Sequence, residues 1–442
     1  MALAQTKTGL IIAALIIGLI IGAAGGYFMA PRVTEKVTET VSTTVTSVKT
    51  VTVTTGAATI TVTAPAKTVT IAKTVTSTVT VTKTVAASPT PTKPLKAAVV
   101  IRKRGDLGFN DMGWLGGQMA VAKLGAKVDY FYYENVPMAQ YLKFLEDICQ
   151  KGYDIIVVVN FMMAEQIATL ADKYPKQKFA ILDAVVEGKP NVVSVLFKEN
   201  EGSALVGALA ALLTKTDKVG IVLGMDIPPL WKFEIGYKWG VHYIMNMTGK
   251  KIKIFWQYTG TFGDPPKGKE AATLMLQQGA DVIYHAAGET GLGVLDAVYE
   301  WAKKTGKEVY AIGVDAPQEW VHPGYIIASM VKHVEVAVYK TIESAALGTF
   351  KGEIWHLGLK EGGVDISKPD DIKKMIDIAV ELKLMSKEEA DKTYKTIIDM
   401  RDKVLKDIWD KIMDLRDKII KGEIKVPYPT AKTIKHLRER YG

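Results

Sequence analysis

Cysteine is almost absent from this chain: its 442 residues include one, Cys149. A disulfide within the chain is therefore impossible, and a zinc site built from several cysteines is excluded. No cysteine lies near the N-terminus, so a lipid-modified cysteine is not expected there. Cys149 belongs to the helical pattern 'FLEDICQKGYD', and we expect it to be a small buried hydrophobe.

The sequence also lacks the short motifs of common nucleotide-dependent and hydrolytic enzymes. It contains no G-x-x-x-x-G-K-[ST] phosphate-binding loop, no G-x-S-x-G turn and no H-E-x-x-H pair. The stretch 'GETGLG' has the wrong spacing for a dinucleotide-binding fingerprint. The six histidines show no ligand spacing, and we expect His285 to pack in the core. We therefore expect no metal and no cofactor.

Strong charge of one sign is missing as well. The net charge is +9, and basic residues alternate with acidic ones, especially after residue 369. No basic stripe carries interleaved aromatic residues, so nucleic acid is not expected as a partner. A basic balance of this size also suits an anionic lipid surface.

One long apolar run stands near the N-terminus. Residues 9–30, 'GLIIAALIIGLIIGAAGGYFMA', carry no charge and are long enough to cross a bilayer as a helix. Tyr27 and Phe28 lie at the far end, where interfacial aromatic residues are expected. We expect residues 1–32 to form a retained single-pass signal anchor in the cell membrane, with the rest of the chain outside. The alternative is a cleaved signal peptide.

Residues 33–95 differ in composition from the rest of the chain. Threonine fills 23 of the 62 positions from 33 to 94 and valine 13, and the segment ends in the proline-rich 'SPTPTKP'. Few large side chains are available for burial, so we expect an extended stalk, decorated at its threonine hydroxyls. The alternation of threonine and valine also leaves open a small β-structure.

After residue 95, apolar strand patterns alternate with amphipathic helix patterns. Examples are 'KAAVVIR', 'DIIVVVN' and 'DVIYHAAG' for strands, and 'VLDAVYEWAKKTG' for a helix. Such alternation predicts an α/β fold with parallel sheets covered on both faces, and the number of strands predicts two doubly wound lobes. We expect residues 96–215 to form an N-terminal lobe, completed by segments after about residue 316. Residues 216–315 would form a C-terminal lobe, and residues 316–442 a return crossing and charged helices.

Polar residues follow several of these strands. In parallel sheets, ligands bind at the carboxyl ends of the strands. 'GDLGFND', residues 105–111, follows the first strand, and the later ends carry Asn160, Asp183, Gly288, Asp315 and Lys332. We expect them to converge on one cleft. The carboxylates of 'GDLGFND' could do acid–base work, but no partner nucleophile is evident, so we expect binding and no enzyme activity.

At these positions the sequence resembles the basic membrane protein family of ABC-transporter substrate-binding proteins, whose best-known members bind purine nucleosides. The matching stretches include 'GDLGFNDMGWLG', 'AIGVDAPQ' and 'IIASMVKHVEVAVY', and 'KGEIKVP' resembles the closing motif of that family. The resemblance implies a periplasmic-binding-protein-like type I fold, with two hinged lobes that close on a ligand. It also implies a transport role outside the cell, with an ABC permease as the partner.

The resemblance also implies residue roles. Phe109 would stack on the base, Asn110 and Asp183 would bind the base edge, and Asp315 and Lys332 would hold the ribose hydroxyls. Asp106 would open the first binding loop. Trp231 or Tyr284 would supply a second aromatic face, and Asn160 and Phe161 lie in a loop where ligand contact is open.

Plainer roles remain open for several of these residues. Phe109 could plug the hinge, Asp183 could form a turn, and Asp315 and Lys332 could form a structural ion pair. Asp111 is expected to cap the following helix.

The chain departs from the family in three respects. It lacks the lipid-anchoring cysteine of that family. The apolar helix and the threonine-rich stalk would replace the lipid anchor, a design that looks archaeal. The loop between Asp315 and Lys332 is short, which leaves the ribose end open to remodelling. Residues 370–421 are longer and more charged than expected, and their pattern predicts one or two amphipathic helices that pack across the lobes.

Three functions follow from these features. The first is a membrane-tethered, extracellular substrate-binding protein of an ABC importer that binds a purine nucleoside. The alternatives are a sugar-binding protein of the same fold and a structural cell-surface protein with a vestigial cleft.

Overall fold

The computed structural model of this protein describes residues 37–45, 50–55, 58–63, 69–77, 94–381 and 383–442. The chain divides into two compact units, Met1–Ala87 and Ser88–Gly442. The expected membrane anchor, residues 1–32, lies outside the described residues. Within the described ranges, no helix is long and apolar enough to cross a membrane.

The described part of the first unit consists of paired strands. β1 (Val37–Val45) pairs antiparallel with β4 (Val69–Ser77), and β2 (Thr50–Thr55) pairs antiparallel with β3 (Ala58–Thr63). Threonine and valine are both enriched in strands. Over these ranges the strand pairing is of the kind expected for the alternative of a small β-structure.

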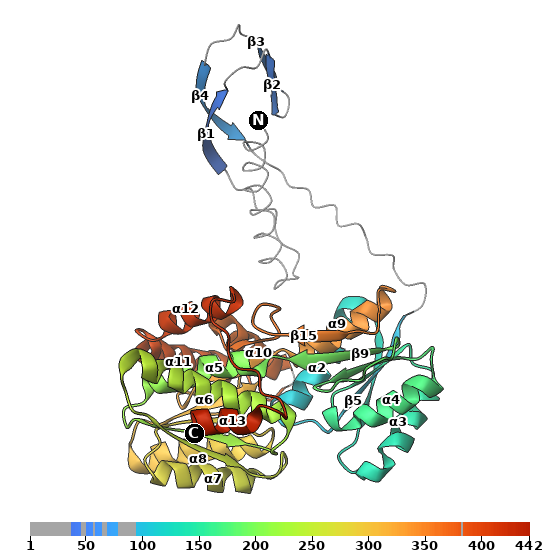
Figure 1. Cartoon of the computed structure of the whole chain (residues 1–442), viewed down its shortest axis with the longest axis vertical. Coiled ribbons are helices and arrows are strands. Elements are labelled where there is room, and N and C mark those ends of the chain that lie inside the picture. The colour runs from blue at the N-terminus through green and yellow to red at the C-terminus, as the bar shows by residue number, and fades with distance from the viewer. Residues whose placement is uncertain (1–36, 46–49, 56–57, 64–68, 78–93, 382) are drawn as a thin grey trace. The chain divides into compact units, whose positions relative to one another are not determined.

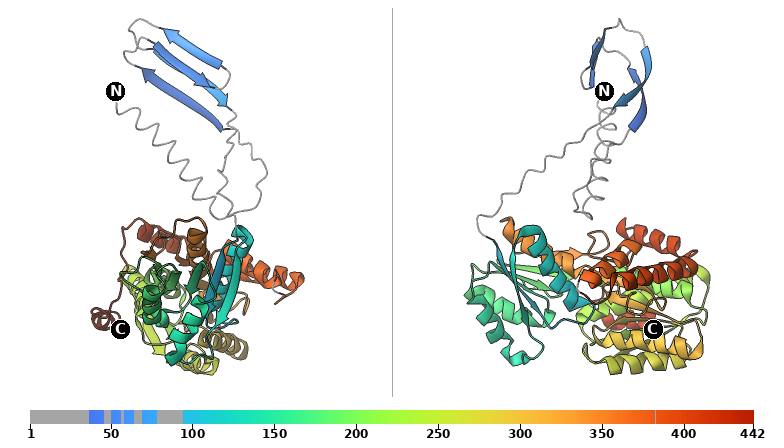
Figure 2. Two further views of the ribbon diagram at one scale, coloured as in Figure 1. Left: turned by 90° about the vertical axis from the view of Figure 1, so that its right-hand side faces the viewer. Right: turned by 180° about the vertical axis from the view of Figure 1, so that it is seen from behind.

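The second unit contains two α/β lobes that lie side by side (Figures 1 and 2). The sheet of the first lobe has the strand order β15-β9-β8-β7-β5-β6, and all its neighbouring strands are parallel. Its strands are β5 (Lys96–Ile101), β6 (Lys127–Tyr132), β7 (Ile155–Val158), β8 (Lys178–Leu182), β9 (Val192–Phe197) and β15 (Ile354–Leu357).

The sheet of the second lobe has the order β11-β10-β12-β13-β14-β16, with β16 antiparallel to β14. When the strands of each lobe are numbered along the chain, both sheets have the order 2-1-3-4-5, followed by a sixth strand. The strands are β10 (Lys218–Leu223), β11 (Lys253–Tyr258), β12 (Val282–Ala286), β13 (Tyr310–Asp315), β14 (Ile326–Lys332) and β16 (Val364–Ile366).

Helices cover both faces of the first sheet. Val99 of β5 belongs to the apolar cluster beneath α2 (Phe109–Leu124) and α9 (Val334–Ala346). The next residue, Val100, belongs to the cluster on the opposite face, beneath α3 (Tyr141–Cys149) and α4 (Ala164–Lys173). Successive side chains of a strand point to opposite faces, so a continuous apolar run is what a doubly covered strand requires. Short 3-10 turns, η2 (Met138–Gln140) and η3 (Phe161–Met163), precede α3 and α4.

The second sheet is covered in the same way. Ile221 of β10 lies in the cluster formed with α5 (Glu199–Leu213) and α6 (Pro228–Thr248), and Ile283 of β12 in the cluster formed with α7 (Pro265–Gln277) and α8 (Thr290–Thr305). Glycines allow α5 and α6 to pack closely: a Cβ at Gly207 would lie 2.1 Å from the Tyr237 carbonyl oxygen. The α/β class and the two doubly wound lobes expected from the sequence are therefore confirmed.

The boundaries of the lobes differ from the expected ones. α5, expected in the first lobe, packs against α6 and against β14 and β16 of the second lobe. β14, expected in the return crossing, belongs to the second sheet, where it lies between β13 and β16. The chain therefore crosses between the lobes after β9, after β14 and after β15. The helical pattern of α5 was visible in the sequence, but the pattern does not state which sheet a helix covers.

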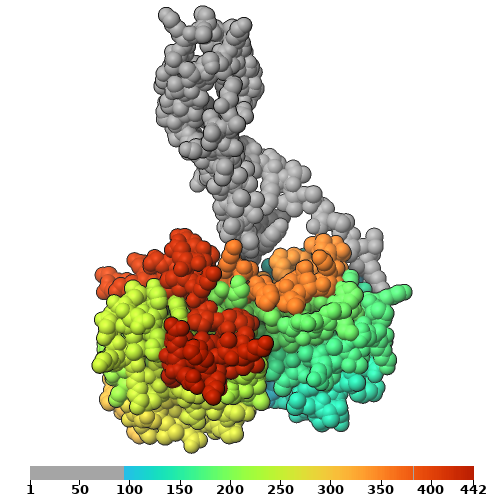
Figure 3. Space-filling view, viewed as in Figure 1, coloured from blue at the N-terminus to red at the C-terminus, as the bar shows by residue number. Residues whose placement is uncertain are grey.

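The C-terminal segment forms more helices than expected. α10 (Pro369–Glu381), α11 (Lys387–Leu405) and α12 (Trp409–Ile420) replace the one or two predicted, and α13 (Ile434–Tyr441) follows. Ser386 starts α11 as a new helix, because its side chain accepts from the Glu389 backbone N–H in a capping box. Figure 3 shows the last segment, in dark red, on the surface of the second lobe, where α13 contacts α6.

Candidate functional site

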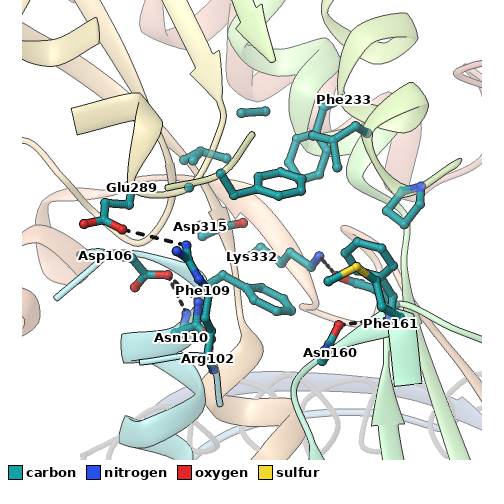
Figure 4. Close-up of a pocket in the computed structure, with 18 of the residues that line it drawn as sticks. Arg102, Asp106, Phe109, Asn110, Asn160, Phe161, Phe233, Glu289, Asp315 and Lys332 are labelled. Carbon is teal, nitrogen blue, oxygen red and sulfur yellow. Dashed lines mark hydrogen bonds and ion pairs between the residues drawn. The ribbon is translucent and has the colours of Figure 1, made fainter. Parts of the chain in front are cut away.

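A cavity lies between the lobes, at the carboxyl ends of parallel strands from both sheets (Figure 4). In sheets of the order 2-1-3-4-5, ligands bind where the order reverses, between the first and third strands. The loops after β5 and β7, and those after β10 and β12, accordingly supply much of its wall. The cavity is lined by Arg102, Lys103, Asp106, Phe109, Asn110, Tyr133, Asn160, Phe161, Met162, Asp183, Pro229, Leu230, Phe233, Phe262, Ala286, Gly288, Glu289, Val314, Asp315 and Lys332.

Most of the residues expected at the site therefore lie around one cavity. Two do not, Trp231 and Tyr284. The Trp231 indole N–H donates to Asp226, and the ring packs with Ile434 and Leu437 of α13. Tyr284 is fully buried, and its ring lies 5.4 Å from that of Tyr237. Neither lines the cavity, so the expectation of a second aromatic face at these positions is wrong.

Asp106 organises the loop that follows β5. Its two carboxylate oxygens accept from the backbone N–H groups of Gly108, Asn110 and Asp111, at 2.9 to 3.1 Å, and from the Asn110 side-chain amide at 2.8 Å. Backbone N–H groups at the start of α2 are thereby satisfied. Burial, and next the charge of Asp111, raise the pKa of Asp106. The role of Asp106 is thus to hold Phe109 and Asn110 in place.

Asp111 holds the preceding part of the same loop. It accepts from the backbone N–H groups of Gly105 at 3.1 Å and Leu107 at 2.9 Å. The expected role of Asp111 as a helix cap is therefore wrong, because Asp106 fills that role. Leu107, with φ of 48°, needs this support, since a side chain disfavours the left-handed region.

Aromatic rings from both lobes face the cavity. Phe109 begins α2 in the first lobe, and Phe233 lies in the second turn of α6 in the second lobe (Figure 4). The Lys332 ammonium lies 4.9 Å from the centre of the Phe109 ring and 5.7 Å from that of Phe233. Between rings of this kind, a planar apolar ligand can be stacked as the lobes close.

Lys332 is the centre of a buried network of charges. Its ammonium lies 2.6 Å from Asp183 and 2.9 Å from Glu199, and Glu199 also contacts Lys232 at 2.5 Å. Burial lowers the pKa of Lys332, but the surrounding carboxylates outweigh it and raise that pKa above its ordinary value. Burial likewise raises the pKa of Glu199, but the two lysines outweigh it and lower that pKa. Lys332 and Glu199 are therefore both charged.

Several buried polar atoms beside this network have no partner within the described chain. They are Asp183 Oδ1, Asp315 Oδ1 and Asn160 Nδ2. The side-chain oxygen of Asn160 already has a partner within its own loop, because it accepts from the Met162 backbone N–H at 2.9 Å. A buried polar atom without a partner costs about 1–3 kcal/mol, so it marks a place where a ligand can bind favourably.

Asp315 is a buried carboxyl group whose pKa is strongly raised. It is 7% exposed, and burial raises its pKa to about 7, against the opposing charge of Lys332. The charges of Asp106, Asp183 and Glu199 also contribute to this raised pKa. At neutral pH this carboxyl group therefore changes readily between its charged and uncharged forms.

The sequence reasoning did not identify Arg102, Lys103, Phe233 or Glu289. The Lys103 ammonium lies 2.9 Å from Glu289, which directly precedes α8 in the other lobe, and 2.9 Å from Glu134. The signal was available, because Lys103 and Glu289 follow β5 and β12 at their carboxyl ends. No such signal in the sequence distinguished Phe233, because it is one of several aromatic residues in α6.

The remaining predictions about side-chain chemistry can also be compared with the structure. Cys149 is buried, which raises the pKa of its thiol to about 11. His285 is buried against Gln318, and burial lowers its pKa to about 4. Both are core residues, as predicted. Among the described residues, no group of histidine, cysteine and acidic side chains could hold a metal ion.

Comparison with known proteins extends this picture. Residues 95–430 match the family described as ABC transporter substrate-binding protein PnrA-like. A lipoprotein of Pyrococcus abyssi, named as uncharacterised, is 41% identical over 76% of this chain and 85% of its own length. The ABC transporter nucleoside-binding protein BmpA of Lactococcus lactis is 31% identical over 65% of this chain and 86% of its own length.

A solved structure agrees with the fold. It is that of an ABC transporter system solute-binding protein from Aeropyrum pernix K1, with 39% identity and a TM-score of 0.74. The match covers 79% of this chain and 97% of that one.

Proposed function

Because this chain belongs to the family of PnrA-like ABC transporter substrate-binding proteins, we propose that its solute is a purine nucleoside, bound between the lobes for delivery to an ABC permease. The observation that carries the proposal is the set of unpartnered polar atoms of Asn160, Asp183 and Asp315 beside two aromatic rings. A nucleoside has a flat base and a ribose rich in hydroxyl groups, and these are the two chemistries that such a set recognises.

Each part of the ligand has a candidate partner. Phe109 and Phe233 would stack on the base, and such stacking is worth about 1–3 kcal/mol per base. Asp183 Oδ1 would accept from the polar edge of the base. The Asn110 side-chain amide, which uses one hydrogen for Asp106, would donate its second hydrogen to the same edge. Asp315 would accept from ribose hydroxyls, in hydrogen bonds strengthened by its charge.

Isothermal titration of the full-length protein with adenosine, guanosine and inosine tests this function. We expect saturable binding of at least one of them, and competition by free ribose only at far higher concentration. Absence of heat and of thermal stabilisation with all three would reject the nucleoside. Ribose competing as well as inosine would instead favour the sugar-binding alternative.

We further propose that the protein acts outside the cell, held at the membrane by residues 9–30. Similarity to lipoproteins of Pyrococcus supports a membrane-held protein. The uncharged run of residues 9–30 is long enough to cross a bilayer as a helix. Mass spectrometry of the protein from native membranes tests it: a mature chain that starts near residue 30 would contradict the anchor.

A further inference from the structure

Four charged residues form a cluster at the cavity wall, where the two lobes meet. Arg102 and Lys103 follow β5, and Glu134 follows β6, all in the first lobe. Glu289 reaches them from the second lobe, at 2.9 Å from Lys103 and 3.7 Å from Arg102 (Figure 4 shows Arg102 and Glu289). The side chain of Glu289 is 19% exposed, so this bridge between the lobes is only partly screened by water.

The other cation of the cavity wall is already neutralised. Lys332 is paired with Asp183 and Glu199, and aromatic rings surround its ammonium. A ligand that carried a phosphate would therefore have Arg102 and Lys103 as its available cationic partners within the described cavity wall. Glu289 holds both of them.

We infer that Glu289 determines the class of ligand, admitting an uncharged nucleoside and excluding its 5′-monophosphate. The inference rests on the proposed function, because it concerns what distinguishes two ligands of that same cavity.

The physical reason is competition for the same two cations. A phosphate that reached Arg102 and Lys103 would have to displace the Glu289 carboxylate, which would then face a doubly charged anion at short range. It would also break an ion pair that joins the lobes. Glu289 directly precedes α8, whose N-terminus would otherwise favour an anion, so its charge removes a second feature that could attract phosphate.

A nucleoside has no such conflict. It leaves the Lys103–Glu289 bridge intact, and the closed lobes then keep the ligand from leaving. Substituting Glu289 should therefore move the two affinities in opposite directions. The nucleoside loses part of the closure, whereas the monophosphate meets Arg102 and Lys103 with one carboxylate partner, Glu134, in place of two.

The test compares adenosine, guanosine and inosine with their 5′-monophosphates by isothermal titration of the full-length protein. For the wild type we expect the monophosphate of the preferred nucleoside to bind at least 100-fold more weakly. In Glu289→Gln, monophosphate binding should strengthen at least tenfold while nucleoside binding weakens by about two- to tenfold. Glu289→Ala should give the same change if the charge is responsible.

Glu134→Gln is the matched control. Glu134 also contacts Lys103, at 2.9 Å, and Arg102, at 3.6 Å, but from within the same lobe. This variant leaves the bridge to Glu289 intact, so the ratio of the two affinities should change by less than about threefold. Melting temperatures of all variants establish that each is folded.

Two results would overturn the inference while the proposed function stands: a wild type that binds nucleoside and monophosphate equally, or Glu289 variants in which both affinities fall in parallel. The parallel fall is what a purely structural role predicts. A wild type that binds no nucleoside would reject the proposed function itself.

Discussion

Asp183 and Asp315 occupy matching positions in the two lobes: each stands at the end of the fourth strand of its sheet, with φ of 63° and 64° respectively. This left-handed conformation is unfavourable for residues with side chains, although aspartate tolerates it better than most. Each also has a buried Oδ1 without a partner in the described structure. Strained backbone and unsatisfied polar atoms cluster at functional sites, so the shared geometry supports a ligand held between these two carboxylates.

Removing either aromatic ring should weaken ligand binding. If Phe109 and Phe233 stack on a base, Phe109→Ala and Phe233→Ala should each raise the Kd for the nucleoside at least tenfold, since tenfold corresponds to about 1.4 kcal/mol. Isothermal titration measures the change. As matched aromatic controls, Trp231→Ala and Tyr284→Phe should alter the Kd by less than about twofold, because neither residue lines the cavity. An equal loss in the controls would argue against stacking.

Nucleoside affinity should depend on pH through Asp315. Burial is the largest of the effects that raise its pKa to about 7. Hydroxyl groups of a ligand donate to the carboxylate and so favour its charged form, which becomes scarce in the free protein below pH 7. We expect the Kd to be level above pH 8 and to rise by up to about tenfold per pH unit below pH 7. Asp315→Asn should bind more weakly and lose this dependence; tighter binding in acid would contradict the assignment.

The same carboxyl group should make the protein less stable at alkaline pH. The pKa of Asp315 is higher in the folded protein than its ordinary value of 3.8, so the folded state holds the extra proton between about pH 4 and 7. The stability that this proton provides is complete below pH 4 and lost as the pH rises through 7. Asp315→Asn should therefore raise the free energy of unfolding by about 1–3 kcal/mol at pH 8.

Thermal unfolding followed by circular dichroism at pH 8 and pH 4.5 measures the effect. The advantage of the variant should be much smaller at the lower pH. A variant less stable than the wild type at pH 8 would show that the Asp315 charge is compensated by groups other than the ligand.

Lys332 should be essential for the stability of the folded protein. Lys332→Met would leave Asp183 and Glu199 without this partner in a buried site, which costs about 3–5 kcal/mol when one member of a buried pair is removed. Lys395→Met provides the control, because the Lys395–Asp399 pair is exposed and contributes little. Denaturant unfolding should show a large loss for the first variant and about 0.5 kcal/mol or less for the second. Equal losses would mean that the network contributes no specific stabilisation.

The alternation of strands and helices predicted both sheets, and the positions of Asn160, Asp183, Asp315 and Lys332 at strand ends predicted that they would line one cavity. These inferences succeeded because they need only the local pattern and the direction of a strand. Tyr284 shows the limit: β12 is buried on both faces, so its sequence does not reveal which face a side chain occupies. Trp231 shows another, since the helix that covers it, α13, lies about 200 residues further along the chain.

The lobe boundary was missed for a related reason. A helix directly after β9 could cover either sheet. α5 covers the second sheet because it packs closely against α6 through glycines such as Gly207 and Gly240. Contacts of this kind join segments far apart in the sequence, and the hydrophobic period of a single helix does not report them.

The crossings between the lobes have an evolutionary consequence. Glu199 directly follows the crossing after β9, and Lys332 directly precedes the one after β14, so the ion pair of the cavity wall joins two of the segments that connect the lobes. A substitution that changes which solute is bound would therefore also alter the rate at which the two lobes open. Solute selectivity and solute release rate are therefore coupled, and natural variants that differ in one should also differ in the other.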